Sequence, residues 1–112
     1  MITKTDRIIL GIIIHSIRSE LGSDIGFKCN GKTRRPVNDA LPTQIAIYFC
    51  NQCFTGAASK EDLSSLFGAH RTYVIYSERA IQKRLSSNRT FQYMMRRIAS
   101  EIEKRIMFLT DQ

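Results

Sequence analysis

Apolar residues recur three and four positions apart over most of this chain, which is the period of amphipathic α-helices. The pattern predicts helices over residues 5–21, 43–54, 59–67, 72–85 and 88–109. We therefore expect an all-α fold of five helices. The positions expected to face the core are, helix by helix, Leu10, Ile13, Ile14, Ile17 and Leu21; Ile45, Ala46, Phe49, Cys50 and Cys53; Leu63, Leu66 and Phe67; Val74, Tyr76 or Ser77, Ile81 and Leu85; Phe91, Met94, Met95, Ile98, Ile102, Ile106 and Leu109.

The first predicted helix contains an isoleucine-rich run, residues 8–14, for which a strand is an alternative because β-branched residues favour sheets. Nothing later in the chain supplies a sheet partner, which favours the helix. The run is roughly a third of the ~20 apolar residues that cross a bilayer, and it lacks the cleavage site of a signal peptide. An odd number of cysteines, 3, makes no disulfide framework. We expect a soluble cytoplasmic protein with no membrane partner.

Glycine, proline and capping residues separate the predicted helices. Residues 22–42 contain several glycines and both prolines with little periodicity, which predicts a long loop between the first two helices. Pro42 precedes the second helix, where a missing N–H has little cost. Ser59 followed by Asp62 is close to a capping box, and Ser87 or Asn88 is expected to cap the last helix. Residues 1–112 then form one domain: an N-terminal apolar helix (1–21), the loop (22–42), a helical core (43–85) and a C-terminal helix (88–109).

Residues 26–33 match the phosphate-binding pattern G-x-x-x-x-G-K-[ST]. Such a loop functions by joining a core strand to a helix, so that backbone N–H groups and the helix dipole face the phosphates. Neither neighbour is predicted here, since Gly-Ser-Asp-Ile precedes the pattern and Pro36 follows it closely. The match is interpreted as a coincidence that leaves Lys32 in an exposed basic loop.

Catalytic and metal-binding chemistry has little support in the sequence. Cys50 and Cys53 form a C-x-x-C motif, but a zinc site needs two further ligands at a compatible spacing. The only further candidates in the sequence are Cys29, His15 and His70. The two cysteines fall near the end of an apolar helix, and this position favours the interpretation that they are small core residues. No histidine has an evident acidic partner. We expect no enzyme activity, no cofactor and no metal.

The chain is basic, and its positive charge is concentrated in two places. The formal net charge is +7 in 112 residues, which points to a polyanionic partner. Residues 28–35 contribute +4 and residues 70–97 contribute +6, while the remainder is net acidic. Charge runs are often only solvated faces, and this reading is favoured for Arg96 and Arg97. For the loop and the start of the fourth helix a phosphate-facing surface is favoured.

The third and fourth predicted helices, residues 59–85 with their turn, have the dimensions of a helix-turn-helix. One further set of residues, in this order along the chain, is Arg34-Arg35, Ala40-Leu41-Pro42-Thr43-Gln44-Ile45-Ala46, Ser59, Leu63, Leu66-Phe67-Gly68, Thr72-Tyr73-Val74-Ile75 and Ile81. In this set the chain resembles the C-terminal DNA-binding domain of the bacterial replication initiator DnaA, over roughly residues 32–85. Between Gly68 and Val74 it is one residue shorter than the family pattern and lacks that pattern's Asp-His pair.

The resemblance implies a Trp-repressor-like helix-turn-helix fold and sequence-specific binding of double-stranded DNA, in replication initiation or transcription regulation. It places Arg34 and Arg35 in a loop that enters the minor groove, and the start of the fourth helix in the major groove. Physical chemistry is compatible with this, because Arg pairs with guanine and Thr meets phosphate or a thymine methyl. The predicted DNA contacts are Lys32, Arg34, Arg35, Ser59, Lys60, His70, Arg71, Thr72 and Tyr73.

A second hypothesis keeps the helical fold without DNA reading. The isoleucine-rich first helix is more apolar than one packing partner requires, so residues 8–17 are expected to dock a protein or a second copy of the chain. Under this hypothesis the protein is an interaction module. The two hypotheses differ in whether the basic residues bind DNA.

Overall fold

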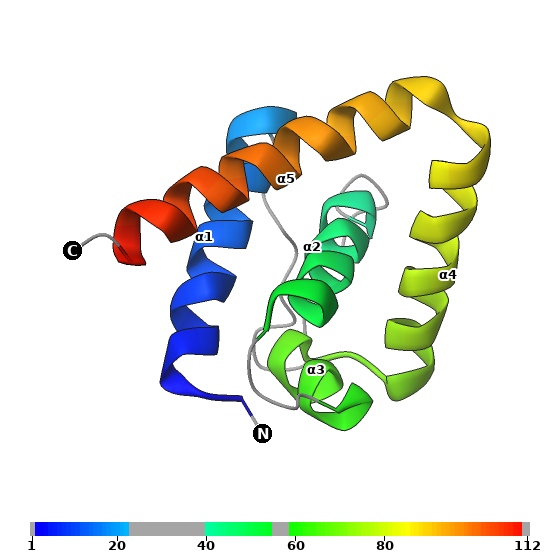
Figure 1. Ribbon diagram of the computed structural model, residues 1–112. Helices are drawn as coiled ribbons and strands as arrows, with labels where there is room; N and C mark the ends of the chain where they lie inside the picture. Colours follow the sequence, from blue (N-terminus) through cyan, green and yellow to red (C-terminus); the bar gives the residue numbers. More distant parts are fainter. Residues whose placement is uncertain (1, 23–39, 55–58, 111–112) are drawn as a thin grey trace.

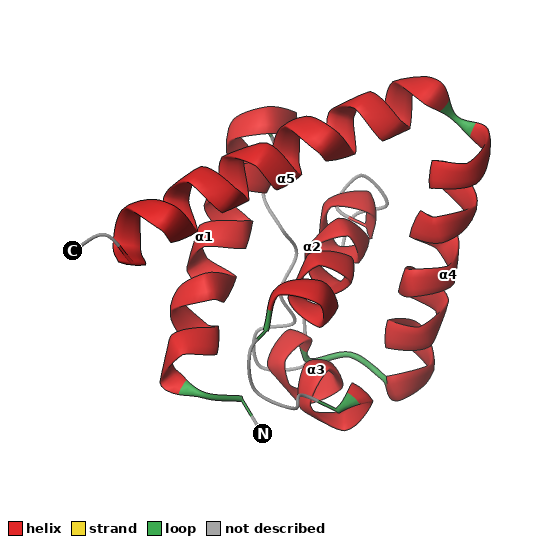
Figure 2. Cartoon of the chain, in the orientation of Figure 1, coloured by secondary structure: helices red, strands yellow, loops and turns green. Residues whose placement is uncertain are grey.

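Helices and short connections make up residues 2–22, 40–54 and 59–110, the parts of the chain that the computed structural model describes (Figure 2). The helices are α1 (Lys4–Leu21), α2 (Ala40–Cys53), α3 (Lys60–Phe67), α4 (Arg71–Ser87) and α5 (Arg89–Thr110). No strand occurs in these ranges, which confirms the all-α prediction and shows that the strand alternative for residues 8–14 is wrong. None of the helices described is long and apolar enough to cross a membrane.

The central helix of the fold is α2, with α1 on one side and α4 on the other (Figure 1). Its residues Ile45, Ala46, Ile47 and Cys50 have no exposed surface, and they point in several directions around the helix. A helix that is apolar on nearly all sides needs neighbours on nearly all sides. The other helices supply them: α5 packs on both α1 and α4, and α3 packs against α2 and the start of α4.

The core is a continuous apolar cluster to which every helix contributes. The long helix α5 buries one stripe of residues spaced three and four apart, in agreement with the predicted period, whereas Met94 and Ile106 of the predicted set are only half-buried and the side chain of Leu109 lies outside what the structure describes. The short helix α3 contributes Phe67, the largest of the fully buried side chains. The buried hydrophobic residues are Ile9, Ile13, Ile17, Ile45, Ala46, Ile47, Phe49, Cys50, Leu63, Phe67, Val74, Ile81, Phe91, Met95, Ile98 and Ile102.

Local capping explains where several helices begin and end. Ser59 and Asp62 form the predicted capping box at α3, with each side chain bonded to the other residue's backbone N–H. Asn88 caps α5 by accepting from the Phe91 N–H at 3.0 Å. Helix α3 ends at Gly68, whose φ of 61° is in the left-handed region that glycine adopts without strain. The prediction of these three boundaries is confirmed.

Two sequence predictions about the helices are corrected, and one that the sequence left open is decided. Helix α2 begins at Ala40 and not at residue 43, since Pro42 is accommodated in a first turn, where its N–H would have no helical partner. The most buried face of α1 includes Ile9, while Leu10 and Ile14 are only half-buried. In α4 the buried choice is Ser77, which donates to the Tyr73 carbonyl at 2.7 Å.

The capping box of α3 gives the protein a pH-dependent contribution to stability. The backbone N–H of Ser59 donates to Asp62 at 3.0 Å and lowers the pKa of that carboxyl. Because the pKa of Asp62 is lower in the folded than in the unfolded protein, its ionised form stabilises the fold at pH values above the unfolded-state pKa of about 3.9. This stabilisation is lost as the pH falls through the folded-state pKa. We expect Asp62→Asn to destabilise the protein at pH 7 and to destabilise it less at pH 2.5. Urea unfolding at both pH values checks this, and a difference independent of pH would contradict it.

Candidate nucleic-acid interface

The connection between α3 and α4 is a tight turn at residues 68–70. The Gly68 N–H donates to the Ser65 carbonyl and the Ala69 N–H donates to the Ser64 carbonyl, at 3.2 and 2.8 Å, which closes the end of α3. His70 is the N-cap of α4 and makes no side-chain capping bond. The positive end of the α4 dipole therefore lies at this turn, beside the exposed residues His70, Arg71 and Thr72.

The structure places the predicted contact residues of α3 and α4 in different environments. His70, Arg71 and Thr72 are exposed. Tyr73 is half-buried and packs against the core. Ser59 is exposed, but its hydroxyl serves the capping box. Lys32, Arg34 and Arg35 lie outside the described residues, as do Cys29 and the pattern at 26–33.

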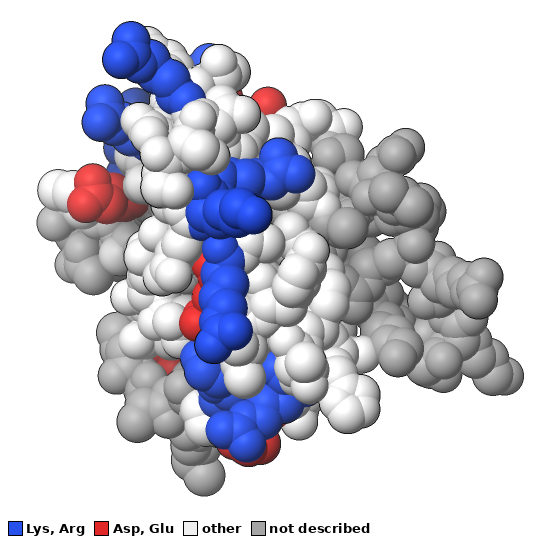
Figure 3. Space-filling view, turned by 90° about the vertical axis from the view of Figure 1, so that its right-hand side faces the viewer, with Lys and Arg blue, Asp and Glu red and all other residues white. Residues whose placement is uncertain are grey.

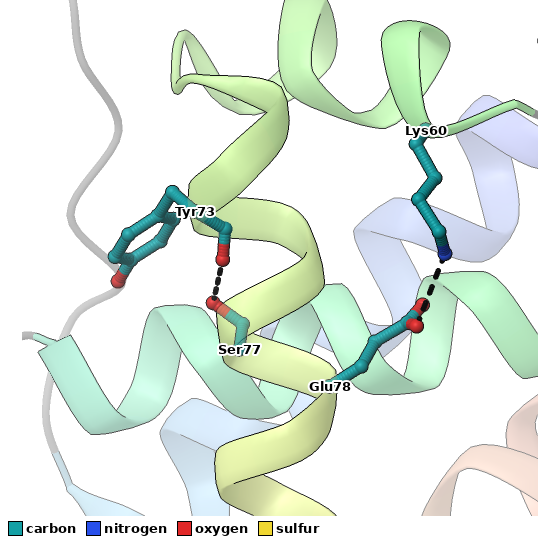
Figure 4. A network of polar contacts seen from close by, with 4 residues as sticks. All are labelled: Lys60, Tyr73, Ser77 and Glu78. Atoms are coloured by element: carbon teal, nitrogen blue, oxygen red, sulfur yellow. Dashed lines mark hydrogen bonds and ion pairs between the residues drawn. The ribbon is translucent and has the colours of Figure 1, made fainter.

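Two ion pairs connect α3 with α4. The Lys60 ammonium lies 3.2 Å from a carboxylate oxygen of Glu78, whose side chain is only 17% exposed (Figure 4). Tyr73 lies away from this pair across α4 in the same view. Arg71 lies 3.2 Å from Glu61, and both side chains are more than 60% exposed. An exposed pair of this kind is weak, so Arg71 can exchange Glu61 for another anion, whereas Lys60 is held between two helices.

The Lys60–Glu78 pair leads to a prediction about stability. Replacing Lys60 with Ala leaves a largely buried carboxylate without its partner, which we expect to cost about 1–2 kcal/mol of unfolding free energy. Adding Glu78→Gln should recover most of this loss, because the unpaired charge is then gone. Thermal or urea unfolding of the single and double variants measures the coupling. Equal stability of Lys60→Ala and the wild type would show that the pair contributes nothing.

Thr72, Tyr76, Arg79 and Lys83 recur three and four residues apart on the side of α4 that faces away from the core, and we call them the α4 outer face. All four are exposed, Tyr76 to 60%. Arg79 and Lys83 form no ion pair with any described residue. The one acid of α4, Glu78, is turned toward α3. The outer face is therefore positive, and Figure 3 shows Lys and Arg side chains forming a column down this side of the molecule.

Comparisons of this chain with protein-family models, curated proteins and solved structures find no match. What the surface can do is therefore argued from its own chemistry. An exposed helix face with cations, a hydroxyl and an aromatic ring has the groups that contact phosphates and base edges.

The DNA contacts predicted from the sequence do not include Tyr76, Arg79 and Lys83 of the candidate interface. Arg79 and Lys83 contribute to the positive charge noted for residues 70–97, but the predicted DNA contacts are confined to the start of α4. Extending the helical period from Thr72 gives all three positions, so the signal was present in the sequence. The sequence allows either Tyr76 or Ser77 to be the buried residue, so it does not by itself assign Tyr76 to the exposed face.

The two cysteines of C-x-x-C are core residues of α2. Cys50 has no exposed surface and Cys53 is half-buried, and both are free thiols. Burial raises the pKa of Cys50 and of Cys53, so both are protonated at neutral pH. A protonated buried thiol is a poor nucleophile and metal ligand. Among the described residues no group of three or more His, Cys, Asp and Glu side chains is placed to hold a metal ion.

A second surface lies on the α1 side of the molecule, across α2 from α4 (Figure 1). It is a groove of about 660 Å³ between α1 and the second half of α5. Ile8 and Phe108 line it and are 53% and 67% exposed. Part of the isoleucine-rich run is thus left uncovered, as the interaction hypothesis expects.

Proposed function

We propose that this protein binds double-stranded DNA, with α3, its turn and α4 acting as a helix-turn-helix whose outer face lies in the major groove. The observation that carries the proposal is the α4 outer face, which is exposed and positive and has no acid. In this proposal the fold is of the Trp-repressor-like type and is related to the DNA-binding domain of DnaA. Lys32, Arg34 and Arg35 contact the minor groove or the phosphates.

The dimensions and chemistry of α4 support this proposal. Its 17 residues make a helix about 25 Å long, and the major groove admits an α-helix. Arg79 can pair bidentately with guanine, and Lys83 can pair with a phosphate. Thr72 and Tyr76 offer hydroxyls to phosphates and apolar carbons to thymine methyl groups. Arg71 joins them by exchanging Glu61 for a phosphate.

Lys60 has a supporting role in this proposal. Its pair with Glu78 holds the single acid of α4 away from the outer face and ties α3 to α4. The duplex then meets the α4 outer face without the carboxylate of Glu78 on it, and Glu61, which pairs with Arg71 at the start of α4, is the acid that a phosphate displaces. The biological role proposed is control of replication initiation or of transcription, through occupation of a DNA site.

The test is a binding titration against salt, followed by selection from random sequences. Fluorescence anisotropy with a labelled duplex should give a log K that falls linearly with log salt, with a slope of about −0.9 for each phosphate neutralised. Selection should then enrich one short motif. The absence of binding at low salt would overturn the proposal. Binding without an enriched motif would overturn its sequence-specific part.

The groove between α1 and α5 favours a second candidate function, a protein-interaction module that pairs two copies through residues 8–17. The observation is the exposure of Ile8 and Phe108 on one surface. Glu101 and Lys104 lie at its edge, so a second copy can meet each charge with its opposite. Sedimentation should then show a concentration-dependent mass that Ile8→Glu abolishes. A constant monomer mass at high concentration would exclude this pairing.

A further inference from the structure

The first half of α5 has an outer face of its own, made of Arg89, Tyr93 and Arg96, which we call the α5 outer face. These residues are spaced three and four apart and are exposed, Tyr93 to 66%. They lie opposite the buried stripe that begins at Phe91 and Met95. The arrangement repeats that of α4, where Tyr76 also lies between exposed polar and basic residues.

Arg89 and Arg96 are available to a ligand, whereas other arginines nearby are engaged. Arg97 lies 3.0 Å from Glu20 on α1, and Arg84 lies over the Phe91 ring at 5.8 Å. Arg105, further along α5, pairs with Glu101 at 3.1 Å. Arg89 and Arg96 form no ion pair with the described residues. Their charge is therefore not offset within the part of the chain that the structure describes.

The corner at Asn88 fixes the α5 outer face relative to α4. The Asn88 N–H donates to the Arg84 carbonyl at 2.9 Å, and its side chain caps α5. The Gln92 amide also donates to the Leu85 carbonyl across the corner. The two helices thus turn sharply without a flexible linker (Figure 1). In Figure 3 further Lys and Arg side chains lie near the top of the view, separated from the column by uncharged residues.

We propose that Arg89, Tyr93 and Arg96 form a second DNA-contact surface, which binds the sugar–phosphate backbone of the duplex that α4 holds. This proposal rests on the proposed function. Phosphate is the group that the residues suit, because two arginine forks and a phenolic hydroxyl donate hydrogen bonds to its oxygens. Because the corner at Asn88 fixes the two outer faces relative to one another, the proposal has one duplex contact both of them at once. The consequence is a footprint longer than α4 alone would give.

Single tryptophans provide the test, because the chain has none of its own. Tyr76→Trp reports on the α4 outer face, Tyr93→Trp on the α5 outer face, and Met107→Trp is the exposed control at the far end of α5, outside the residues that line the groove. On titration with a 20-base-pair duplex we expect the emission of the first two to change at the same DNA concentration. The control should not change. Circular dichroism verifies that each variant is folded.

The outcomes separate this proposal from the proposed function. If Tyr76→Trp responds and Tyr93→Trp does not, the second surface is wrong and the α4 interface stands. If neither responds and the wild type shows no binding by anisotropy, both are wrong. A response of Met107→Trp as large as that of Tyr93→Trp would also overturn the second surface, since DNA contact would not be confined to it.

A charge experiment supplies an independent readout. Replacing Arg89 and Arg96 with Ala should lower the slope of log K against log salt by about 2, one unit for each lost phosphate contact. Lys4→Ala, which removes an exposed base at the start of α1, should leave the slope unchanged. An unchanged slope in the double variant would overturn the proposal.

Discussion

Replacing both Arg79 and Lys83 with Glu is expected to reduce DNA affinity about 100-fold or more at 100 mM salt. Removing an arginine that contacts a base costs about 1–3 kcal/mol, and removing a phosphate contact flattens the salt dependence by about one unit. The introduced carboxylates add repulsion from the phosphates. Fold and stability should change little, because both side chains are exposed and neither forms an ion pair with a described residue.

A control variant with the same change in net charge shows whether the loss of DNA affinity depends on where the charges are changed. Arg7→Glu together with Lys104→Glu also changes two exposed bases to acids, on α1 and the second half of α5. This variant lowers the net charge equally and should lose affinity far less. Anisotropy titrations of both variants at several salt concentrations make the comparison. Equal losses would show that only the overall charge of the protein matters and would contradict an interface on α4.

Replacing Phe67 with Ala is expected to destabilise the fold by about 3–5 kcal/mol, a large part of the stability of a small domain. Phe67 has no exposed surface and is the last residue of α3, directly before the left-handed Gly68. Removing its ring leaves a cavity in the core, which the neighbouring side chains fill only in part. Because the turn into α4 depends on this packing, DNA binding should weaken along with stability.

Two further variants identify the physical cause of that loss. Phe67→Leu keeps most of the apolar volume and should cost less than Phe67→Ala. Phe108→Ala removes the same side chain from an exposed position and should change stability by less than about 0.5 kcal/mol. Urea unfolding at pH 7 measures all three. Similar stabilities of Phe67→Ala and Phe108→Ala would contradict the core assigned here.

The helices were predictable because their stabilising interactions are local or periodic. The capping box of Ser59 and Asp62 and the cap at Asn88 depend on residues three apart, so the sequence alone indicates them. The start of α2 was less predictable, because Pro42 is compatible with either side of a helix boundary. The buried face of α1 is set by how α1 lies against α2 and α5, which periodicity does not specify.

The candidate site was predictable only in part, for a related reason. Thr72 and Arg71 were placed at the surface from their position after the turn, and they are exposed. The sequence could not show that Lys60 is held by Glu78, eighteen residues away, since this depends on the packing of α3 on α4. The helical period from Thr72 does place Tyr76 on the outer face, but the sequence left either Tyr76 or Ser77 as the buried residue, and the structure decides for Ser77.

The most direct test of the DNA interface is an NMR titration of the isotope-labelled 12.9 kDa protein with a duplex that carries the selected motif. We predict that the largest amide shift changes occur at Thr72, Tyr76, Arg79 and Lys83. Gly11 and His15, in the groove between α1 and α5, should change little. Changes confined to that groove, or none along α4, would contradict the account.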